Sequence, residues 1–315
     1  GPREGSDKRF IYTTKASKAL EIKDLWKVYT KKDIDIDVEN GDLITELDKS
    51  EDAVVAVRGV SLAARQGEVF VIMGLSGSGK STLIRCVIRL IEPTSGEIWV
   101  NGQEVSSLPK KDLTEFRRKQ IAMVFQHYGL LPHKTIIDNV EFGLKLQGVS
   151  EKERRERSNV ALERVGLKGW ENYYPSSLSG GMRQRVGIAR ALVMDTPILL
   201  MDEPFSGLDP LIRREMQDEL IRLQKELKKT IFFVTHDLDE AMRMGDRMAV
   251  MKNGTIVQMG APAQILANPA DEYVARFVQD KRRQIQMADE GAFVNGESMD
   301  EIPGKGVMDH ISRES

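Results

Sequence analysis

The chain has 315 residues, of which 41% are hydrophobic and 30% charged, with a formal net charge of −2. This near-neutral balance gives no general attraction to nucleic acid or to an anionic membrane. No apolar run approaches the roughly 18 residues of a membrane span, and the lone cysteine, Cys86, permits no internal disulfide. We therefore expect a globular protein of one or two domains in a reducing compartment.

The first half of the chain alternates strand and helix signals. Residues 1–19 are polar and are expected to be loose. After them the pattern predicts strands at 20–29, 54–64, 68–74, 97–102 and 121–125, with an acidic stretch after the first and a helix at 83–91.

The second half is richer in helical patterns. We expect helices within 127–178, from Ser179 to about Met194 and over 210–229, strands at 198–201 and 231–235, and a hairpin at 249–260. Strands alternating with helices predict an α/β fold with a mainly parallel sheet. The middle helical stretch, about 127–178, is expected to form a separate lobe, and 281–315 a polar tail.

A glycine-rich motif follows the strand predicted at 68–74. GLSGSGKS, residues 74–81, fits the phosphate-binding pattern G-x-x-x-x-G-K-[ST] between a strand and a helix. Its backbone N–H groups and the helix N-terminus would cradle phosphates, while Lys80 reaches the β- and γ-phosphates and Ser81 binds Mg²⁺. A flexible glycine and serine turn is the alternative. The predicted nucleotide contacts are Gly74, Ser76, Gly77, Ser78, Gly79, Lys80, Ser81 and Thr82.

Two adjacent acids end a second apolar strand. Asp202 and Glu203 follow ILLM, where burial of a carboxylate is costly. In nucleotide-hydrolysing P-loop proteins an acid at this position holds Mg²⁺, which suits Asp202. Glu203 could then polarise the attacking water as a general base. A solvated turn with two acids is the alternative.

Four other patterns are weaker signals. DIDIDVENG, 33–41, has calcium-loop spacing but places Val38 where a glycine is needed, so a solvated acidic loop is expected. KERRER, 152–157, is expected to be a solvated helix face carrying i,i+4 charge pairs rather than a nucleic-acid patch. TKKD, 30–33, mimics a guanine-specificity motif but precedes the phosphate loop. The histidines, at 127, 133, 236 and 310, show no zinc spacing.

Further motifs resemble those of ABC ATPases. LSGGMRQR, residues 178–185, resembles the signature motif of that family, and it lies between the phosphate loop and ILLMDEP as it does there. The resemblance covers about residues 20–280. It implies that Gln126 is the Q-loop glutamine and that SGLD, ending at Asp209, is the D-loop. It also implies that His236 is the switch histidine and that Tyr29 is the aromatic residue that stacks on adenine.

The resemblance implies a fold and a mechanism. The fold is a P-loop NTPase of ABC type, with an antiparallel β subdomain and a helical subdomain beside the parallel core. ATP held by one subunit would be capped by Ser179, Gly180 and Gly181 of a second copy, with Asp209 crossing the dimer interface. Glu203 and His236 would hold the attacking water. Gln126 would contact either the γ-phosphate or Mg²⁺, for which Ser81 and Asp202 are the other predicted ligands.

A narrower resemblance rests on GLSGSGKSTLIR, AMVFQHYGLLPHKT, FSGLDPLIRREMQDEL and THDLDEAMRMGDRMAVMKNG. These runs resemble the ATP-binding subunits of bacterial importers for glycine betaine, proline betaine, choline and similar amines. The implied partners are two permease subunits and an extracytoplasmic substrate-binding protein, at the cytoplasmic face of the inner membrane. Familiar members often carry tandem CBS modules, for which the 281–315 tail is too short. The ATP-binding subunit of an importer for trimethylamine N-oxide would have much the same sequence, so this amine belongs to the expected substrate class.

Two other classes stay open at this point. One is a soluble ABC ATPase of repair or translation, although the single copy of each motif and the lack of long heptads do not favour it. The other is the ATPase of an exporter or of an importer for another small solute. The transported molecule itself is expected to contact permeases and a binding protein, not this chain.

Overall fold

The structure is a computed structural model that describes residues 17–126, 129–280, 283, 286 and 287. Most of the predicted loose segment 1–19 and of the tail 281–315 lies outside the described residues, as do His127 and His310. Lys18 and Ala19 belong to the first strand, so the prediction of a loose segment was wrong for these two residues.

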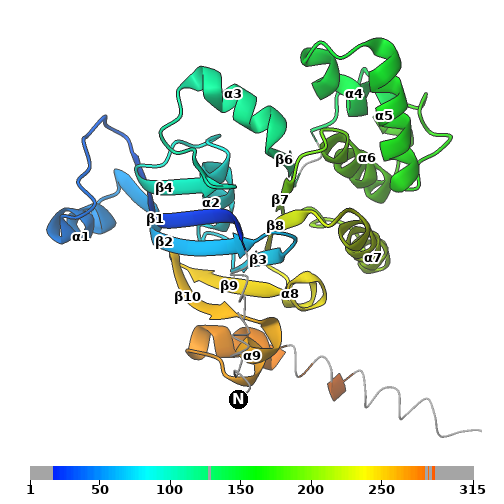
Figure 1. Ribbon diagram of the computed structural model, residues 1–315. Helices are drawn as coiled ribbons and strands as arrows, with labels where there is room; N and C mark the ends of the chain where they lie inside the picture. Colours follow the sequence, from blue (N-terminus) through cyan, green and yellow to red (C-terminus); the bar gives the residue numbers. More distant parts are fainter. Residues whose placement is uncertain (1–16, 127–128, 281–282, 284–285, 288–315) are drawn as a thin grey trace, which may run out of the picture.

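A six-stranded sheet forms the centre of the molecule (Figure 1). In spatial order its strands are β10 (Thr255–Gly260), β9 (Arg247–Lys252), β3 (Val69–Met73), β8 (Thr230–Thr235), β7 (Ile198–Asp202) and β6 (Ile121–Val124). All neighbours pair in parallel except β10 and β9, which form the predicted hairpin on Asn253 and Gly254. The predicted mainly parallel α/β sheet is confirmed.

A second sheet is antiparallel and packs on one face of the first. It contains β2 (Ala53–Arg65), β1 (Lys18–Thr30), β4 (Ser95–Val100) and β5 (Gln103–Glu104). Successive side chains of a strand point to opposite faces. Phe70 and Ile72 of β3 therefore join the core formed with this sheet and α2 (Lys80–Val87), while Val71 and Met73 join the core on the other face.

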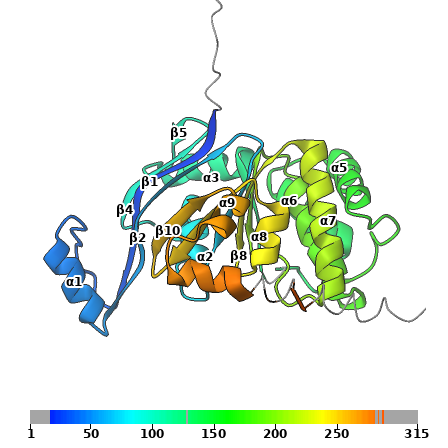
Figure 2. The same cartoon turned by 90° about the horizontal axis from the view of Figure 1, so that it is seen from below.

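Helices α6 (Gly180–Leu192), α7 (Pro210–Leu227) and α8 (Leu238–Met244) pack on that other face. Helices α4 (Ile136–Leu146) and α5 (Glu151–Arg164) pack on α6 farther from the sheet (Figures 1 and 2), and the short turn η1 (Pro175–Ser177) precedes α6. Met216, Leu220 and Leu223 of α7 are buried at the predicted helical spacing. Two further helices are α3 (Lys110–Lys119) and α9 (Pro262–Ala267). Across the described residues no helix has both the length and the apolar character to span a membrane.

The acidic stretch after β1 holds a helix that the sequence analysis did not predict. Asn40 accepts a hydrogen bond from the N–H of Leu43 at 3.1 Å and caps α1 (Gly41–Lys49). Ile44 and Leu47 of this helix pack against Val28 and Val55 in a small separate cluster. Helix α1 projects from the ends of β1 and β2, opposite the helical side of the molecule (Figure 2).

The prediction that KERRER is only a solvated face was wrong in part. Arg157 pairs with Glu153 one turn earlier, as expected. Arg154 and Arg155, however, lie 3.3 and 3.2 Å from the carboxylate of Glu141, a buried residue of α4. A buried carboxylate needs a cationic partner, so this cluster joins α5 to α4 through charge.

Candidate functional site

The phosphate loop lies between β3 and α2, as predicted. Gly77 and Gly79 have φ angles of 80° and 96°, a region that favours glycine. A Cβ at Gly79 would come within 2.2 Å of the carbonyl oxygen of Ala56 on β2. The loop therefore keeps its shape because glycines occupy these positions, and α2 begins directly at Lys80.

Residues from four strand ends meet around one cavity of about 620 Å³. The phosphate loop follows β3, Gln126 follows β6, Glu203 follows β7 and His236 follows β8, so all lie at the carboxyl edge of the parallel sheet. The lining residues are Leu75, Ser76, Gly77, Gly79, Lys80, Ser81, Thr82, Gln126, Glu203, Ser206 and His236.

Asp202 lies behind the cavity wall and is 1% exposed. Its carboxylate accepts a hydrogen bond from the Ser81 hydroxyl at 3.0 Å and lies 3.4 Å from the guanidinium of Arg85. Burial raises the pKa of the Asp202 carboxyl, and these two partners oppose that effect. Within the described part of the chain no group of three or more His, Cys, Asp or Glu could hold a metal by itself. A hydroxyl beside one carboxylate suits Mg²⁺, which takes few protein ligands besides phosphates and water.

Glu203 faces the cavity and has a different set of partners. Its φ angle is 45°, an unusual backbone conformation for a residue with a side chain. Its carboxylate lies 3.0 Å from Nδ1 of His236 and 3.5 Å from Nζ of Lys80. The two adjacent acids are thus separated into two environments, each with its own hydrogen-bond donors.

Tyr29 lies at a neighbouring cavity of about 830 Å³. The two cavities share Gly77, Gly79 and Thr82, so the tyrosine flanks the far side of the phosphate loop. Tyr29 is 41% exposed as a residue, and Nζ of Lys27 lies 5.0 Å from the centroid of its ring. The other lining residues are Asp48, Ala53, Val54, Val55, Ala56, Arg58, Lys252, Asn253, Gly254 and Thr255.

The predicted signature and dimer residues are not among those lining either cavity. The Ser179 hydroxyl accepts a hydrogen bond from the N–H of Met182 and caps α6. Asp209 caps α7 in the same way through Ile212. A Cβ at Gly181 would approach Ile212 within 2.5 Å. Within one chain, these residues have structural roles at two helix starts.

Sequence reasoning missed several residues of the site. Ser206 lines the cavity, and its hydroxyl accepts a hydrogen bond from Gln126 at 3.5 Å. Arg85 lies one helical turn after Ser81, so an i,i+4 count could have found it. Asp48 and Arg58, which pair beside the Tyr29 cavity, carry no local signal.

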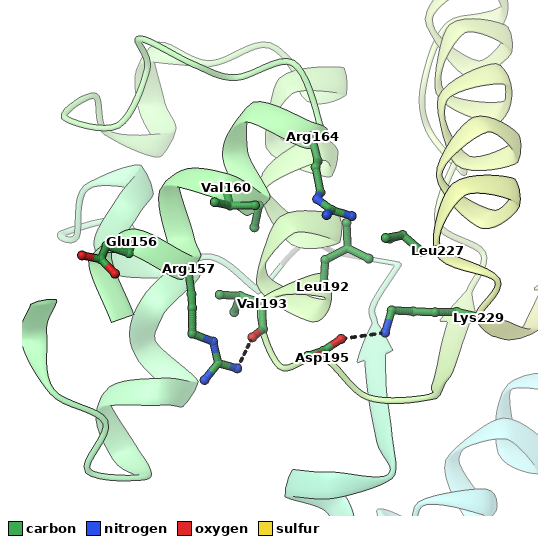
Figure 3. A pocket seen from close by; sticks show the side chains of 10 residues that line it. Glu156, Arg157, Val160, Arg164, Leu192, Val193, Asp195, Leu227 and Lys229 are labelled. Atoms are coloured by element: carbon green, nitrogen blue, oxygen red, sulfur yellow. Dashed lines mark hydrogen bonds and ion pairs between the residues drawn. The ribbon is translucent and has the colours of Figure 1, made fainter. Parts of the chain in front are cut away.

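A further hollow, of about 360 Å³, lies between α5 and the ends of α6 and α7 (Figure 3). Two of its cations have partners: Arg157 donates to the carbonyl oxygen of Val193 at 2.8 Å, and Lys229 pairs with Asp195 at 3.2 Å. It contains none of the predicted site residues.

A parallel sheet with a glycine loop ahead of α2 and two acids at the end of β7 defines a P-loop nucleotide-binding protein. Residues 57–206 match the ABC transporter family. The chain therefore belongs to the ABC transporter ATP-binding proteins, in the group that includes glycine betaine and trimethylamine N-oxide transport proteins.

Individual relatives support this placement. The chain is 52% identical over 266 residues to the glycine betaine/carnitine transport ATP-binding protein GbuA of Listeria monocytogenes, covering 84% of this chain and 67% of that protein. It is 49% identical over 273 residues to the trimethylamine N-oxide transport ATP-binding protein TmoW of Ruegeria pomeroyi, covering 85% and 80%. It spans 63% of the glycine betaine transport protein OpuAA of Bacillus subtilis.

Solved structures of ABC cassettes share the fold. A dimeric post-hydrolysis structure of the cassette MJ0796 with ADP and Pi matches with a TM-score of 0.66 at 33% identity, covering 77% of this chain and 98% of that one.

Proposed function

We propose that the chain is the ATP-hydrolysing subunit of an ABC importer for a quaternary or methylated amine. The observation that supports it is the convergence of Lys80, Glu203 and His236 at one cavity beside the glycine loop. The amine class rests on the relatives, which are named as transport proteins for glycine betaine and trimethylamine N-oxide.

The phosphate loop would bind the triphosphate. Lys80 lies at the cavity with its Nζ 3.3 Å from the carbonyl oxygen of Leu75 and 3.5 Å from Glu203, so it can turn toward the β- and γ-phosphates. Tyr29 would stack on the base in the adjoining cavity. Ser81, Asp202 and Gln126 would hold Mg²⁺, which when bound offsets the negative charge of the phosphates.

Hydrolysis needs a water aligned with the γ-phosphate and a group to take its proton. Glu203 is the general base in this proposal, because its carboxylate faces the cavity while Asp202 is buried behind it. Nδ1 of His236 donates a hydrogen bond to Oε1 of Glu203, since an ionised carboxylate can only accept. This contact orients the base and leaves Nε2 free of that bond.

The site would be completed by a second copy of the chain. Ser179, Gly180 and Gly181 start α6, whose N-terminal N–H groups favour an anion. Because the Ser179 oxygen only accepts from Met182, its own O–H is still available as a donor. A γ-phosphate bound at Lys80 of one copy would meet this helix start in the other, with Asp209 at the interface between them.

The subunit would work at the cytoplasmic face of a bacterial inner membrane, attached to two permease subunits that receive the amine from an extracytoplasmic binding protein. No nucleic acid is involved. Specificity for the amine would reside in those partners.

The first test measures nucleotide turnover by the purified chain. We expect Mg²⁺-dependent release of phosphate from ATP, and a loss of ATP affinity of about tenfold or more in Lys80→Ala, since one charge facing the phosphates disappears. Lys145→Ala, at the end of α4, is the control and should behave as wild type. Equal ATP affinity of Lys80→Ala and wild type by calorimetry contradicts the proposed phosphate site.

The second test addresses the transported class. The chain is reconstituted with its permease and binding-protein partners in proteoliposomes, and ATP turnover is followed with glycine betaine, choline, trimethylamine N-oxide and methionine inside or outside the vesicles. Stimulation by a methylated amine presented with the binding protein supports the importer. Stimulation by methionine alone, or none by any amine, overturns the amine class.

A further inference from the structure

The C-terminal part of the described chain reaches back to the phosphate loop through one tyrosine. Residues 272–280 are helical and follow α9. The hydroxyl of Tyr273 accepts a hydrogen bond from the N–H of Leu75 at 3.2 Å and donates one to the carbonyl oxygen of Met251 at 3.1 Å. Leu75 is the second residue of the phosphate loop, and Met251 lies near the end of β9. One hydroxyl therefore bridges two segments that flank the nucleotide site.

The residue held by this tyrosine also organises the loop. The carbonyl oxygen of Leu75 accepts from Nζ of Lys80 at 3.3 Å and from the N–H of Ser78 at 3.1 Å. The backbone of Leu75 is thus fixed on its N–H side by Tyr273 and on its carbonyl side by the loop itself. A shift of Leu75 would move the atom on which the lysine rests.

The same junction is closely packed at Gly74. A Cβ at this position would lie 2.6 Å from the carbonyl oxygen of Met251 and 2.5 Å from the Ser78 hydroxyl oxygen. The start of the phosphate loop therefore touches the end of β9 at the oxygen to which Tyr273 donates. Two independent contacts, one steric and one polar, register the loop against this strand.

The helical segment that brings Tyr273 to the loop is itself anchored. Asp271 accepts from the N–H of Val274 at 2.8 Å and caps the segment. The tyrosine ring meets Phe277 edge to face at 5.1 Å, and Nζ of Lys252 lies 5.0 Å from its centroid. The side-chain amide of Gln258 on β10 bonds the backbone of both Asn268 and Ala270. The ring is held on several sides, so its hydroxyl has a defined position.

We propose that Tyr273 is a positioning residue of the nucleotide site, whose hydroxyl fixes Leu75 so that the loop is already shaped for the phosphates common to ATP and ADP. This inference rests on the proposed nucleotide-binding function. Without the hydroxyl, the loop would become ordered only when a nucleotide binds, and the entropy lost in that ordering would lower the affinity.

The test compares the full-length chain with Tyr273→Phe, which keeps the ring and removes only the hydroxyl. Loss of the hydroxyl's two hydrogen bonds, to Leu75 and to Met251, predicts that the Kd for ADP and the KM for ATP rise about two- to tenfold, while kcat stays within about twofold. The control is Tyr173→Phe, which removes a hydroxyl in the helical region, where the Tyr173 ring packs on Trp170.

The outcomes separate cleanly. Weaker ADP binding in Tyr273→Phe but not in Tyr173→Phe supports the inference, whether or not the lost hydrogen bonds also lower the nucleotide-free Tm. ADP binding equal to wild type overturns it. So does a lower nucleotide-free Tm with unchanged ADP affinity, which marks a purely structural role, or an equal loss of ADP affinity in Tyr173→Phe. If the wild-type chain itself binds no ADP, the proposed function falls and this inference falls with it.

Discussion

Asp202 and Glu203 are neighbours in the chain but differ in what surrounds them. Asp202 ends a fully buried strand and is contacted by Ser81 and Arg85. Glu203 turns outward through a positive φ angle toward Lys80 and His236. Two like charges this close would repel strongly if they shared one environment. The change in backbone direction between them allows one carboxylate to lie behind the cavity and the other to face it.

The buried position of Asp202 predicts a pH dependence of stability in the absence of nucleotide and Mg²⁺. Burial raises the pKa of this carboxyl above its ordinary value of 3.8, so folding favours its protonated form. The group's contribution to stability is complete below that ordinary value and is lost as pH rises through the folded-state pKa. Asp202→Asn should therefore be more stable than wild type near neutral pH, with a gap that narrows as pH falls toward about 4.

Urea unfolding at several pH values measures that gap. Asp195→Asn, whose wild-type side chain is 85% exposed, is the control and should show little pH-dependent difference. With Mg²⁺ and ATP present the order should reverse, because wild type gains stability from a ligand that the asparagine variant holds poorly. A stability gap between Asp202→Asn and wild type that does not change with pH contradicts the raised pKa of the Asp202 carboxyl.

The site's local motifs are readable in the sequence, but its long-range contacts are not. Lys80, Ser81, Asp202 and Glu203 were predicted because each lies in a short pattern with its own chemistry. The roles of these residues stay predictions, although the structure brings them together. Tyr273 contacts Leu75 across 198 positions of the chain, and no local pattern encodes a contact of that kind.

Two helices begin at residues to which the family resemblance gave intermolecular roles. Ser179 caps α6 and Asp209 caps α7. A side-chain cap satisfies a backbone N–H that the helix cannot, so both residues would be useful even in a chain that never dimerises. Stability measurements on the single subunit can distinguish the two roles.

Asp209→Ala should lower the free energy of unfolding by about 1 kcal/mol, since alanine cannot accept from the N–H of Ile212. Asp209→Asn should stay close to wild type, because asparagine caps equally well. Urea unfolding without nucleotide gives both values. If the alanine and asparagine variants are equally stable, capping contributes nothing, and only the interface role is left for this residue.

At the scale of elements, most strands, the long helices and the short helix α2 were predictable, and the other short helices were not. Helix α7 shows a clear apolar stripe and a capped start. Helix α1 was missed because its stretch is acidic overall, although Asn40 and the spacing of Ile44 and Leu47 were available signals. Helix α3 starts after Pro109 without a side-chain cap, which removes the sequence signal for its beginning.

For the molecule as a whole, the arrangement of the strands in the sheet determines where the cavity lies. The carboxyl ends of β3, β6, β7 and β8 form one edge, and the catalytic candidates all follow those ends. The signature residues start α6 and do not line that cavity in the same chain. The proposal of a closed site therefore needs a second copy, which agrees with the dimeric form of the similar cassette MJ0796.

Glu203→Gln tests this closure directly. Glutamine keeps the shape of the side chain but cannot take a proton, so ATP turnover should fall about a hundredfold or more while ATP still binds. A complex that cannot hydrolyse its bridging triphosphate should stay closed. Light scattering after size exclusion should give a monomer without nucleotide and a dimer with ATP and Mg²⁺. Monomers at saturating ATP would contradict the two-copy site.

Ser179→Asp in the Glu203→Gln background shows whether the helix start of α6 makes the contact. Aspartate caps a helix as well as serine does, so α6 should keep its stability. Its negative charge, however, would face the γ-phosphate of the other copy, and like charges in a closed interface cost several kcal/mol. The double variant should therefore bind ATP with unchanged affinity and remain monomeric. A stable dimer in this variant would place the contact elsewhere on the molecule.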